Sequence, residues 1–196
     1  MWKRSFDVVS ALSGLVFLSP VFFLIAVVIV LTYHFPIFFL QKRVGRGGEE
    51  FTLYKFRTMN VHEGAEGGSF DAGSMARITE VGRVLRRTKL DELPQLWNVL
   101  RGDMSLVGPR PEVRKWVDAY PKRWAIVLAV RPGITDPASI EFRNEEELLA
   151  TQRNPESYYR EIILQRKLDL YEQYVKNCTF LGDLGILWKT FVALFR

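Results

Sequence analysis

The sequence predicts an α/β protein that is mostly helical with short strands, with an N-terminal re-entrant membrane helix-hairpin and a C-terminal amphipathic interfacial helix. Three observations predict this class. Residues 8–41 contain no Asp, Glu, Lys or Arg, residues 51–59 alternate apolar and polar side chains, and apolar residues recur at helical spacing within 180–195.

Composition is typical of one domain with an appended membrane element. The 196 residues carry a formal net charge of +5, which indicates a polyanionic partner such as anionic lipid or a nucleotide. Cys178 is the only cysteine, so an internal disulfide is excluded, and two histidines far apart in sequence do not predict a zinc site. No nucleic-acid-binding motif is present, so we expect no nucleic-acid partner. The expected parts are a hairpin over 1–41, a cytoplasmic domain over 42–178, and a membrane-surface helix over 179–196 that belongs to the same single domain.

The uncharged N-terminal run is too long for one comfortable membrane span and too short for two. As one straight helix, residues 8–41 would measure ~51 Å against a hydrocarbon core of about 30 Å. Pro20 lies near the middle and cannot donate to the carbonyl of Val16, so the helix must kink or break there. The hydroxyl of Ser19 is placed to satisfy a freed carbonyl. Pro36 is expected to end the second arm.

Charge decides between a re-entrant hairpin and a kinked single span. Cations flank both ends of the run: Lys3, Arg4, Lys42, Arg43 and Arg46. Cationic flanks prefer the cytoplasmic side, so a single span violates this preference at one end and a hairpin satisfies it at both. The pattern therefore favours the hairpin.

The C-terminal segment repeats apolar residues at i, i+3 and i+4. One interpretation is an amphipathic helix in the headgroup plane with Trp188 at the interface. The alternative is a helix packed on the domain's own core. The apolar N-terminal run favours the membrane interpretation.

The segment between these elements is mostly helical. FTLYKFRTM at 51–59 predicts a short strand, and the glycine-rich stretch 60–76 predicts a loop. Thr79 is expected to cap a helix that runs to about Arg87. MSLVG predicts a second strand, and Asn154-Pro155 opens a long helix to about Lys176.

TKLDELPQLWNV at 88–99 places two adjacent acids, Asp91 and Glu92, ahead of Pro94. Proline is tolerated in the first helical turn, so we expect the helix to begin near 90–93 and its positive terminus to favour ionised carboxylates. Neighbouring residues on a helix do not share a face, so the two acids should point in different directions. An ionised carboxylate there serves as nucleophile, metal ligand or base. Alternatively, both acids only cap the helix on a solvated face.

Cations surround this pair in the sequence, and two of them are conformationally restricted. Arg110 in GPRPE and Arg131 in VRPGIT each precede a proline, which disfavours the helical region for their backbones. Guanidinium groups presented in this way suit phosphate oxygens, whereas the alternative is a solvated loop. A carboxylate that attacks a phosphate needs arginines and Mg²⁺ to offset charge repulsion.

The residues resemble the monotopic phosphoglycosyl transferases, the bacterial sugar transferase family, in a minimal catalytic-domain form. The resemblance rests on an apolar hairpin with Ser19-Pro20 followed by YKFRTM, LRRTKLDELPQLWNVLRGDMSLVGPRPE and RPGIT, in that order over nearly the whole chain. It implies transfer of a phospho-sugar from a UDP-sugar to a polyprenol phosphate such as undecaprenyl phosphate, with release of UMP. It also implies a location on the cytoplasmic face of the bacterial inner membrane and a role in the first membrane step of glycan assembly.

The resemblance also implies roles for individual residues. Asp91 is the expected nucleophile, forming an aspartyl phospho-sugar, and Glu92 assists the prenol phosphate or the metal. Mg²⁺ is the expected cofactor, held by Asp91 and the diphosphate. The expected substrate-binding residues are Lys55, Arg57, Arg86, Arg110, Arg131, Arg143 and Asp169.

One segment departs from the family pattern. Many members continue RPGIT with Gly-Leu-x-Gln and then Gly-Arg-Asn, whereas this chain has Asp136-Pro137-Ala138-Ser139 and later Phe142-Arg143-Asn144. The departure concerns the nucleotide and sugar contacts, and the sequence does not identify the sugar. Two rival functions stay open: a non-catalytic, membrane-bound basic scaffold, and direct transfer in a ternary complex without a covalent intermediate.

Overall fold

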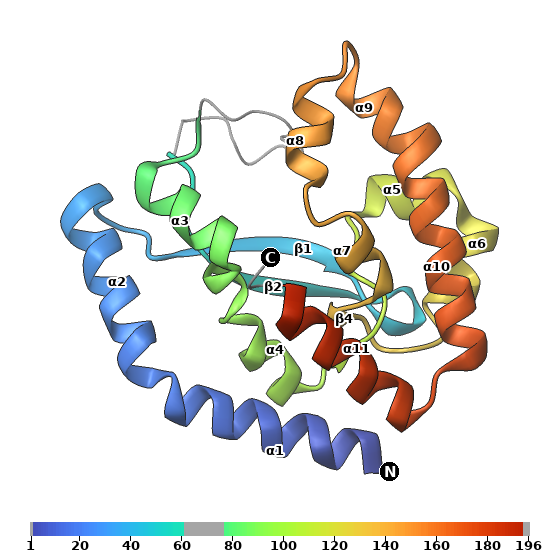
Figure 1. The fold of residues 1–196 in the computed structure, drawn as a ribbon, viewed down its shortest axis with the longest axis horizontal. Coiled ribbons are helices and arrows are strands. Elements are labelled where there is room, and N and C mark those ends of the chain that lie inside the picture. The colour runs from blue at the N-terminus through green and yellow to red at the C-terminus, as the bar shows by residue number, and fades with distance from the viewer. Residues whose placement is uncertain (1, 61–76, 194–196) are drawn as a thin grey trace.

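The structure is a computed structural model that describes residues 2–60 and 77–193 (Figure 1). It is mostly helical with short strands, as predicted. The elements are α1 Trp2–Phe17, α2 Ser19–Tyr33, β1 Phe38–Val44, η1 Arg46–Gly48, β2 Glu50–Phe56, α3 Glu80–Thr88, η3 Leu90–Glu92, α4 Gln95–Arg101, β3 Ser105–Val107, α5 Arg114–Ala119, α6 Pro121–Val127, β4 Gly133–Thr135, α7 Pro137–Glu141, α8 Glu145–Ala150, α9 Pro155–Tyr158, η4 Tyr159–Ile163, α10 Leu164–Asn177 and α11 Phe180–Ala193.

Most of the predicted local elements are present. The strand predicted at 51–59 is β2, MSLVG contains β3, and the Thr79 side chain caps α3 by accepting from the Gly82 amide at 2.9 Å. The long helix predicted from Asn154-Pro155 is α9 and α10, joined by the π-helical turn η4. The loop predicted at 60–76 lies outside the described residues except for residue 60.

The N-terminal run breaks where the sequence predicts. α1 and α2 meet at a 58° bend, and Ser19 Oγ donates to the Val16 carbonyl oxygen at 2.8 Å, the carbonyl that Pro20 leaves without its amide partner. Within residues 2–60 and 77–193, no single helix has the length and hydropathy to cross a membrane. The bent pair α1 and α2 has, taken together, the length and apolar composition of such a segment. α2 ends at Tyr33, and β1 begins at Phe38, inside the segment expected to form the hairpin.

Both ends of the bent pair are attached to the rest of the domain. In α1, the buried Asp7 accepts from Ser105 Oγ at 2.8 Å and from the Leu106 amide at 3.1 Å. Arg4 donates to the Val99 carbonyl of α4 at 2.7 Å. At the other end, Arg57 donates to the last carbonyls of α2.

α11 combines features of both interpretations of the C-terminal segment. The buried Asp183 accepts from Tyr174 Oη at 2.7 Å and pairs with Lys3, which fastens α11 to α10 and α1. Leu181 and Trp188 are 78% and 67% exposed, so the opposite face of the helix presents apolar side chains. One face of α11 therefore packs on the domain and the other is unpartnered within the described residues.

Two small sheets position Lys55 and Arg110, which contact Glu92 of the acid pair. β1 and β2 form an antiparallel hairpin, and β3 and β4 pair in parallel. Gly108 and Gly133 lie back to back beside β3 and β4: a Cβ on Gly133 would come within 2.1 Å of the Gly108 nitrogen. This close backbone approach requires glycine at both positions and places Arg110 just beyond the carboxyl end of β3.

Candidate active site

The two acids lie in a tight turn between α3 and α4. α3 ends at Thr88, the capping residue Lys89 adopts the left-handed conformation with φ of 58°, and the 3₁₀ turn Leu90–Glu92 follows at once. A left-handed lysine is uncommon because its Cβ crowds the backbone, and such residues cluster at functional sites. Leu93 and Pro94 stay in the right-handed helical region, and α4 then begins at Gln95. The expected helical start near 90–93 is therefore present as a 3₁₀ turn.

Glu92 is buried and saturated by two cations. Its Oε1 accepts from Lys55 Nζ at 2.9 Å and from Arg110 Nη2 at 2.5 Å, and its Oε2 accepts from Arg110 Nη1 at 3.2 Å. Burial alone would raise the pKa of Glu92, but the Arg110 and Lys55 charges hold that pKa well below its usual range. The Glu92 carboxylate in turn raises the pKa of Arg110 well above its ordinary value. Glu92 is therefore ionised at neutral pH and holds Lys55 and Arg110 together.

Asp91 has the opposite environment. Its side chain is buried, and its Oδ1 is inaccessible to solvent and has no hydrogen-bond partner among the described residues. Burial raises the pKa of Asp91, and the Lys55 charge opposes this shift. The expectation that a helix terminus would favour the ionised form is outweighed here by desolvation. Adjacent acids whose environments push their pKa values apart are typical of an active site with divided roles.

Lys55 and Arg86 complete the charged surroundings of the pair. Lys55 comes from β2, and burial lowers its pKa while Glu92 raises it. Arg86 comes from α3, donates to Thr58 Oγ1 at 2.9 Å and to Glu146 Oε1 at 2.9 Å, and is close enough to Asp91 to contribute to its pKa shift. The structure therefore gathers Lys55, Arg86 and Arg110 around the two acids.

Asp136 is a further acid that the sequence analysis did not assign to the site. It follows β4 directly, is fully buried, and caps α7 by accepting from the Ser139 amide at 2.9 Å. Burial raises the pKa of Asp136, and its charge interacts with Arg110. An acid followed by proline after a strand is a helix-cap signal, so the sequence offered a way to find it. Asp136 and Arg110 both lie beyond the carboxyl ends of parallel strands, where open α/β sheets bind ligands.

Four predicted substrate-binding residues have contacts away from the acids. Arg57 follows β2, is 9% exposed, and donates to the carbonyl oxygens of Tyr33, His34 and Phe35 at 2.6–3.1 Å. Its guanidinium therefore caps the negative end of α2, which accounts for its charge without a phosphate. Arg131 donates to the Gly102 carbonyl at 2.9 Å.

The remaining two lie farther along the chain. Asp169 points outward from α10 and pairs with Arg123 at 2.6 Å, while Lys167 is the residue on the buried face of that helix. Arg143 lies between α7 and α8, half-buried, and has no ion pair within the described ranges. Within the described residues, neither Asp169 nor Arg143 forms an ion pair with a member of the acid site.

The donor set fits a magnesium ion that is shared with a substrate phosphate. Among residues 2–60 and 77–193, no group of three or more His, Cys, Asp and Glu side chains is arranged to hold a metal. Mg²⁺ commonly takes one or two carboxylates and fills its other positions with phosphate oxygens and water. Asp91 Oδ1, which has no hydrogen-bond partner among the described residues, would be available to such an ion, whereas the oxygens of Glu92 are occupied by cations.

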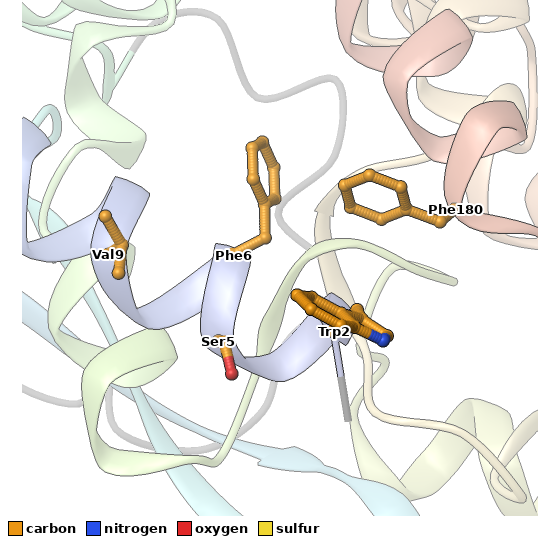
Figure 2. Close-up of a pocket in the computed structure, with 5 residues that line it drawn as sticks. All are labelled: Trp2, Ser5, Phe6, Val9 and Phe180. Carbon is orange, nitrogen blue, oxygen red and sulfur yellow. The ribbon is translucent and has the colours of Figure 1, made fainter.

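A cavity of about 440 Å³ lies elsewhere, between the start of α1 and the start of α11. Figure 2 shows its lining side chains, with Phe6 and Phe180 facing one another; their ring centroids are 5.4 Å apart. None of the predicted site residues lines it. It continues the exposed apolar surface of α1 and α11 and is separate from the acid pair.

Comparisons with known proteins agree with the resemblance in the sequence. The chain is 43% identical over 196 residues to a UDP-glucose:undecaprenyl-phosphate glucose-1-phosphate transferase from Caulobacter vibrioides, covering 98% of this chain and 69% of the relative. It is 37% identical over 191 residues to a UDP-N-acetylgalactosamine-undecaprenyl-phosphate N-acetylgalactosaminephosphotransferase from Aeromonas hydrophila, covering 96% of this chain but only 42% of that longer relative. It is 34% identical to the exopolysaccharide production protein ExoY from Rhizobium meliloti, covering 99% of this chain and 85% of the relative. A family model described as bacterial sugar transferase matches residues 1–196, and the chain belongs to that family.

Proposed function

We propose that this protein transfers a phospho-sugar from a UDP-sugar to a polyprenol phosphate through a covalent aspartyl phospho-sugar on Asp91. The observation that carries the proposal is the contrast between the adjacent acids. Glu92 is saturated by Lys55 and Arg110, whereas Asp91 is buried and its Oδ1 has no hydrogen-bond partner among the described residues. An unpaired carboxylate with a raised pKa is a better nucleophile than one that is held by cations. The relatives' names specify UDP-sugars and undecaprenyl phosphate, which supports the same substrate classes here.

The chemistry takes two displacements at one phosphorus. A carboxylate oxygen of Asp91 attacks the sugar-bearing phosphorus of the UDP-sugar, the bond from that phosphorus to the oxygen of UMP breaks, and UMP leaves with the electron pair. A phosphate oxygen of the polyprenol phosphate then attacks the same phosphorus. The bond to Asp91 breaks, which restores the carboxylate and yields a polyprenol diphosphate sugar.

The cations at the site reduce the repulsion between the carboxylate and the incoming phosphates. Lys55, Arg86 and Arg110 all contribute positive charge near Asp91 or Glu92. Preorganised charges of this kind stabilise developing charge at phosphoryl oxygens without reorganisation. Mg²⁺, held by Asp91 together with the diphosphate, would supply further charge neutralisation. Glu92 keeps Lys55 and Arg110 in place while the substrates exchange.

We also propose that the bent helix pair is re-entrant and that the domain lies on the cytoplasmic face of the inner membrane. The start of α1 is bound to β3 and α4 through Asp7 and Arg4, and the end of α2 is held by Arg57. Since both ends are attached to one domain, both ends lie on one side of a membrane that receives the bend. Apolar side chains near the bend, including Phe17 and Phe23, are 81% and 73% exposed, as a lipid-facing surface requires.

UMP release tests the proposal and separates it from its rivals. The protein in detergent is incubated with single UDP-sugars, with and without undecaprenyl phosphate. The covalent route predicts about one UMP per enzyme without acceptor and continuous release with it. Direct transfer in a ternary complex predicts no UMP without acceptor. A scaffold that lacks catalysis predicts no UMP with any of the sugars.

A further inference from the structure

Gln95 carries a second buried polar atom without a partner, one helical turn after Asp91. It is the first residue of α4, is 1% exposed, and its Nε2 has no hydrogen-bond partner among the described residues. Buried polar atoms in folded proteins are nearly always paired, so each exception needs an explanation. Asp91 Oδ1 is another such atom. These two atoms are an acceptor and a donor that come from neighbouring turns.

The backbone places the two residues on adjacent turns of one continuous run. Leu93 and Pro94 are both right-handed helical, so the chain continues from the 3₁₀ turn into α4 without a reversal. Asp91 and Gln95 are four residues apart, which is about one turn along such a run.

Asn98, one turn after Gln95 in α4, has hydrogen-bond partners for its side-chain amide, unlike Gln95 Nε2. Asn98 is 0% exposed; its Oδ1 accepts from the Tyr54 amide at 3.1 Å, and its Nδ2 donates to the Thr52 carbonyl at 2.7 Å. These bonds fix α4 against β2. Because Asn98 already attaches α4 to β2, the backbone at Gln95 is held in place while the Gln95 Nε2 donor is left free of structural hydrogen bonds within the described residues.

We propose that Gln95 is a phosphoryl-binding residue, whose side-chain amide donates to an oxygen of the phosphoryl group that is transferred through Asp91. The inference rests on the proposed function and adds a residue to it. A neutral amide donor suits this position because it binds a phosphoryl oxygen without pairing with the Asp91 carboxylate as a cation would. A donor aimed at the transferred group stabilises both displacements, since the same phosphoryl group passes through a transition state twice.

Two other roles for Gln95 make different predictions. If the side chain only fills space, an apolar residue of equal length serves as well. If the amide turns to bind the free Asp91 carboxylate, it stabilises the resting nucleophile. Removing it would then leave adduct formation unchanged or faster. Only phosphoryl binding predicts that both half-reactions slow down.

The test measures the two half-reactions separately in Gln95→Met and Gln95→Glu. Methionine keeps the length of the side chain and removes the donor, whereas glutamate keeps the shape and replaces the donor by a negative charge. Gln173→Met on the exposed face of α10 is the matched control. Intact-mass spectrometry follows formation of the phospho-sugar adduct after addition of a UDP-sugar, and then its discharge by undecaprenyl phosphate. Thermal unfolding of each substrate-free variant is measured in parallel.

We expect Gln95→Met to slow both half-reactions by on the order of 10- to 100-fold, with Gln95→Glu slower still. The melting temperature of Gln95→Met should stay within about 2 °C of the parent, because the free protein loses no hydrogen bond. Adduct formation by Gln95→Met at the parent rate, or Gln95→Glu as active as Gln95→Met, overturns the proposal. If the parent protein itself forms no adduct, the proposed function fails instead, and the two failures are distinguished.

Discussion

Glu92→Gln tests whether the Glu92 carboxylate stabilises the fold by pairing with Lys55 and Arg110. Glu92 accepts one bond from Lys55 and two from Arg110, and its side chain is 10% exposed. Glutamine keeps one carbonyl oxygen but turns an NH₂ group towards one of these donors. It also removes the counter-charge from Lys55 and Arg110. The substitution therefore leaves two cations buried with reduced compensation, although its volume hardly changes.

The magnitude follows from the burial of the pair. Removing one partner of a buried ion pair costs about 3–5 kcal/mol, because the other charge stays desolvated. A chain of this size loses roughly 2–4 °C in melting temperature per kcal/mol, so Glu92→Gln should lower it by about 6–20 °C. Glu146→Gln is the matched control: Glu146 pairs with Arg86 at 2.9 Å, but its side chain is 52% exposed. Exposed pairs contribute about 0–1 kcal/mol, so this control should melt within about 4 °C of the parent.

The effect of Glu92→Gln should also depend on pH. The pKa of Glu92 is depressed in the folded protein, so its stabilisation is fully present above the ordinary value of 4.5. It is lost progressively as pH falls from there towards the depressed folded pKa. Thermal unfolding in detergent at pH 7 and at decreasing pH below 4.5 measures both quantities. Equal melting temperatures for the parent and Glu92→Gln at pH 7 would refute the claim that Glu92 stabilises the fold through Lys55 and Arg110.

Three further predictions address the nucleophile, the α2 cap and the membrane geometry. The pKa of Asp91 is raised, and a nucleophilic carboxylate must be deprotonated, so kcat/KM should fall as pH decreases, with an apparent pKa above 3.8. An apparent pKa at or below 3.8 contradicts the assignment of Asp91 as nucleophile. Arg57→Met should lower the melting temperature without changing KM for the UDP-sugar, whereas a raised KM with an unchanged melting temperature assigns Arg57 to phosphate. With Cys178 replaced, single cysteines at Ser5 and Glu49 should both resist a membrane-impermeant maleimide in intact cells and both react once the inner membrane is opened; labelling of Ser5→Cys alone in intact cells indicates a spanning helix.

The features that the sequence predicts well are local. Pro20 must lose a hydrogen bond wherever the chain goes, and Ser19 is the nearest donor, so the bend and its Ser19–Val16 bond follow from neighbouring residues. The acids ahead of Pro94 are likewise a local signal for the start of a helix. Their opposite environments are not predictable in this way. They depend on Lys55 and on the Arg110 side chain, which arrive from distant parts of the chain.

The features that the sequence does not predict depend on tertiary partners or on a change of helical phase. Period-2 spacing puts Lys55 and Arg57 on one side of an extended segment, but β2 ends at Phe56, and Arg57 turns to the end of α2. The π-helical turn before α10 inserts an extra residue per turn and rotates the following face, so the inward position is Lys167 and Asp169 points outward. The sequence does not predict β1, because its first residues, 38–41, continue the uncharged apolar run and carry no strand signal of their own.

A covalent phospho-sugar on Asp91 is the most direct test of the central claim. The protein is mixed with a UDP-sugar and Mg²⁺ without polyprenol phosphate, quenched, digested and mapped by mass spectrometry, with Asp91→Asn as the control. We expect one phospho-sugar on the peptide that contains Asp91 and no adduct in Asp91→Asn. The melting temperature of Asp91→Asn should be at or above that of the parent, since the substitution removes a buried charge whose Oδ1 has no hydrogen-bond partner among the described residues. An adduct on another residue, or Asp91→Asn that retains even a few per cent of parental turnover, would contradict the account.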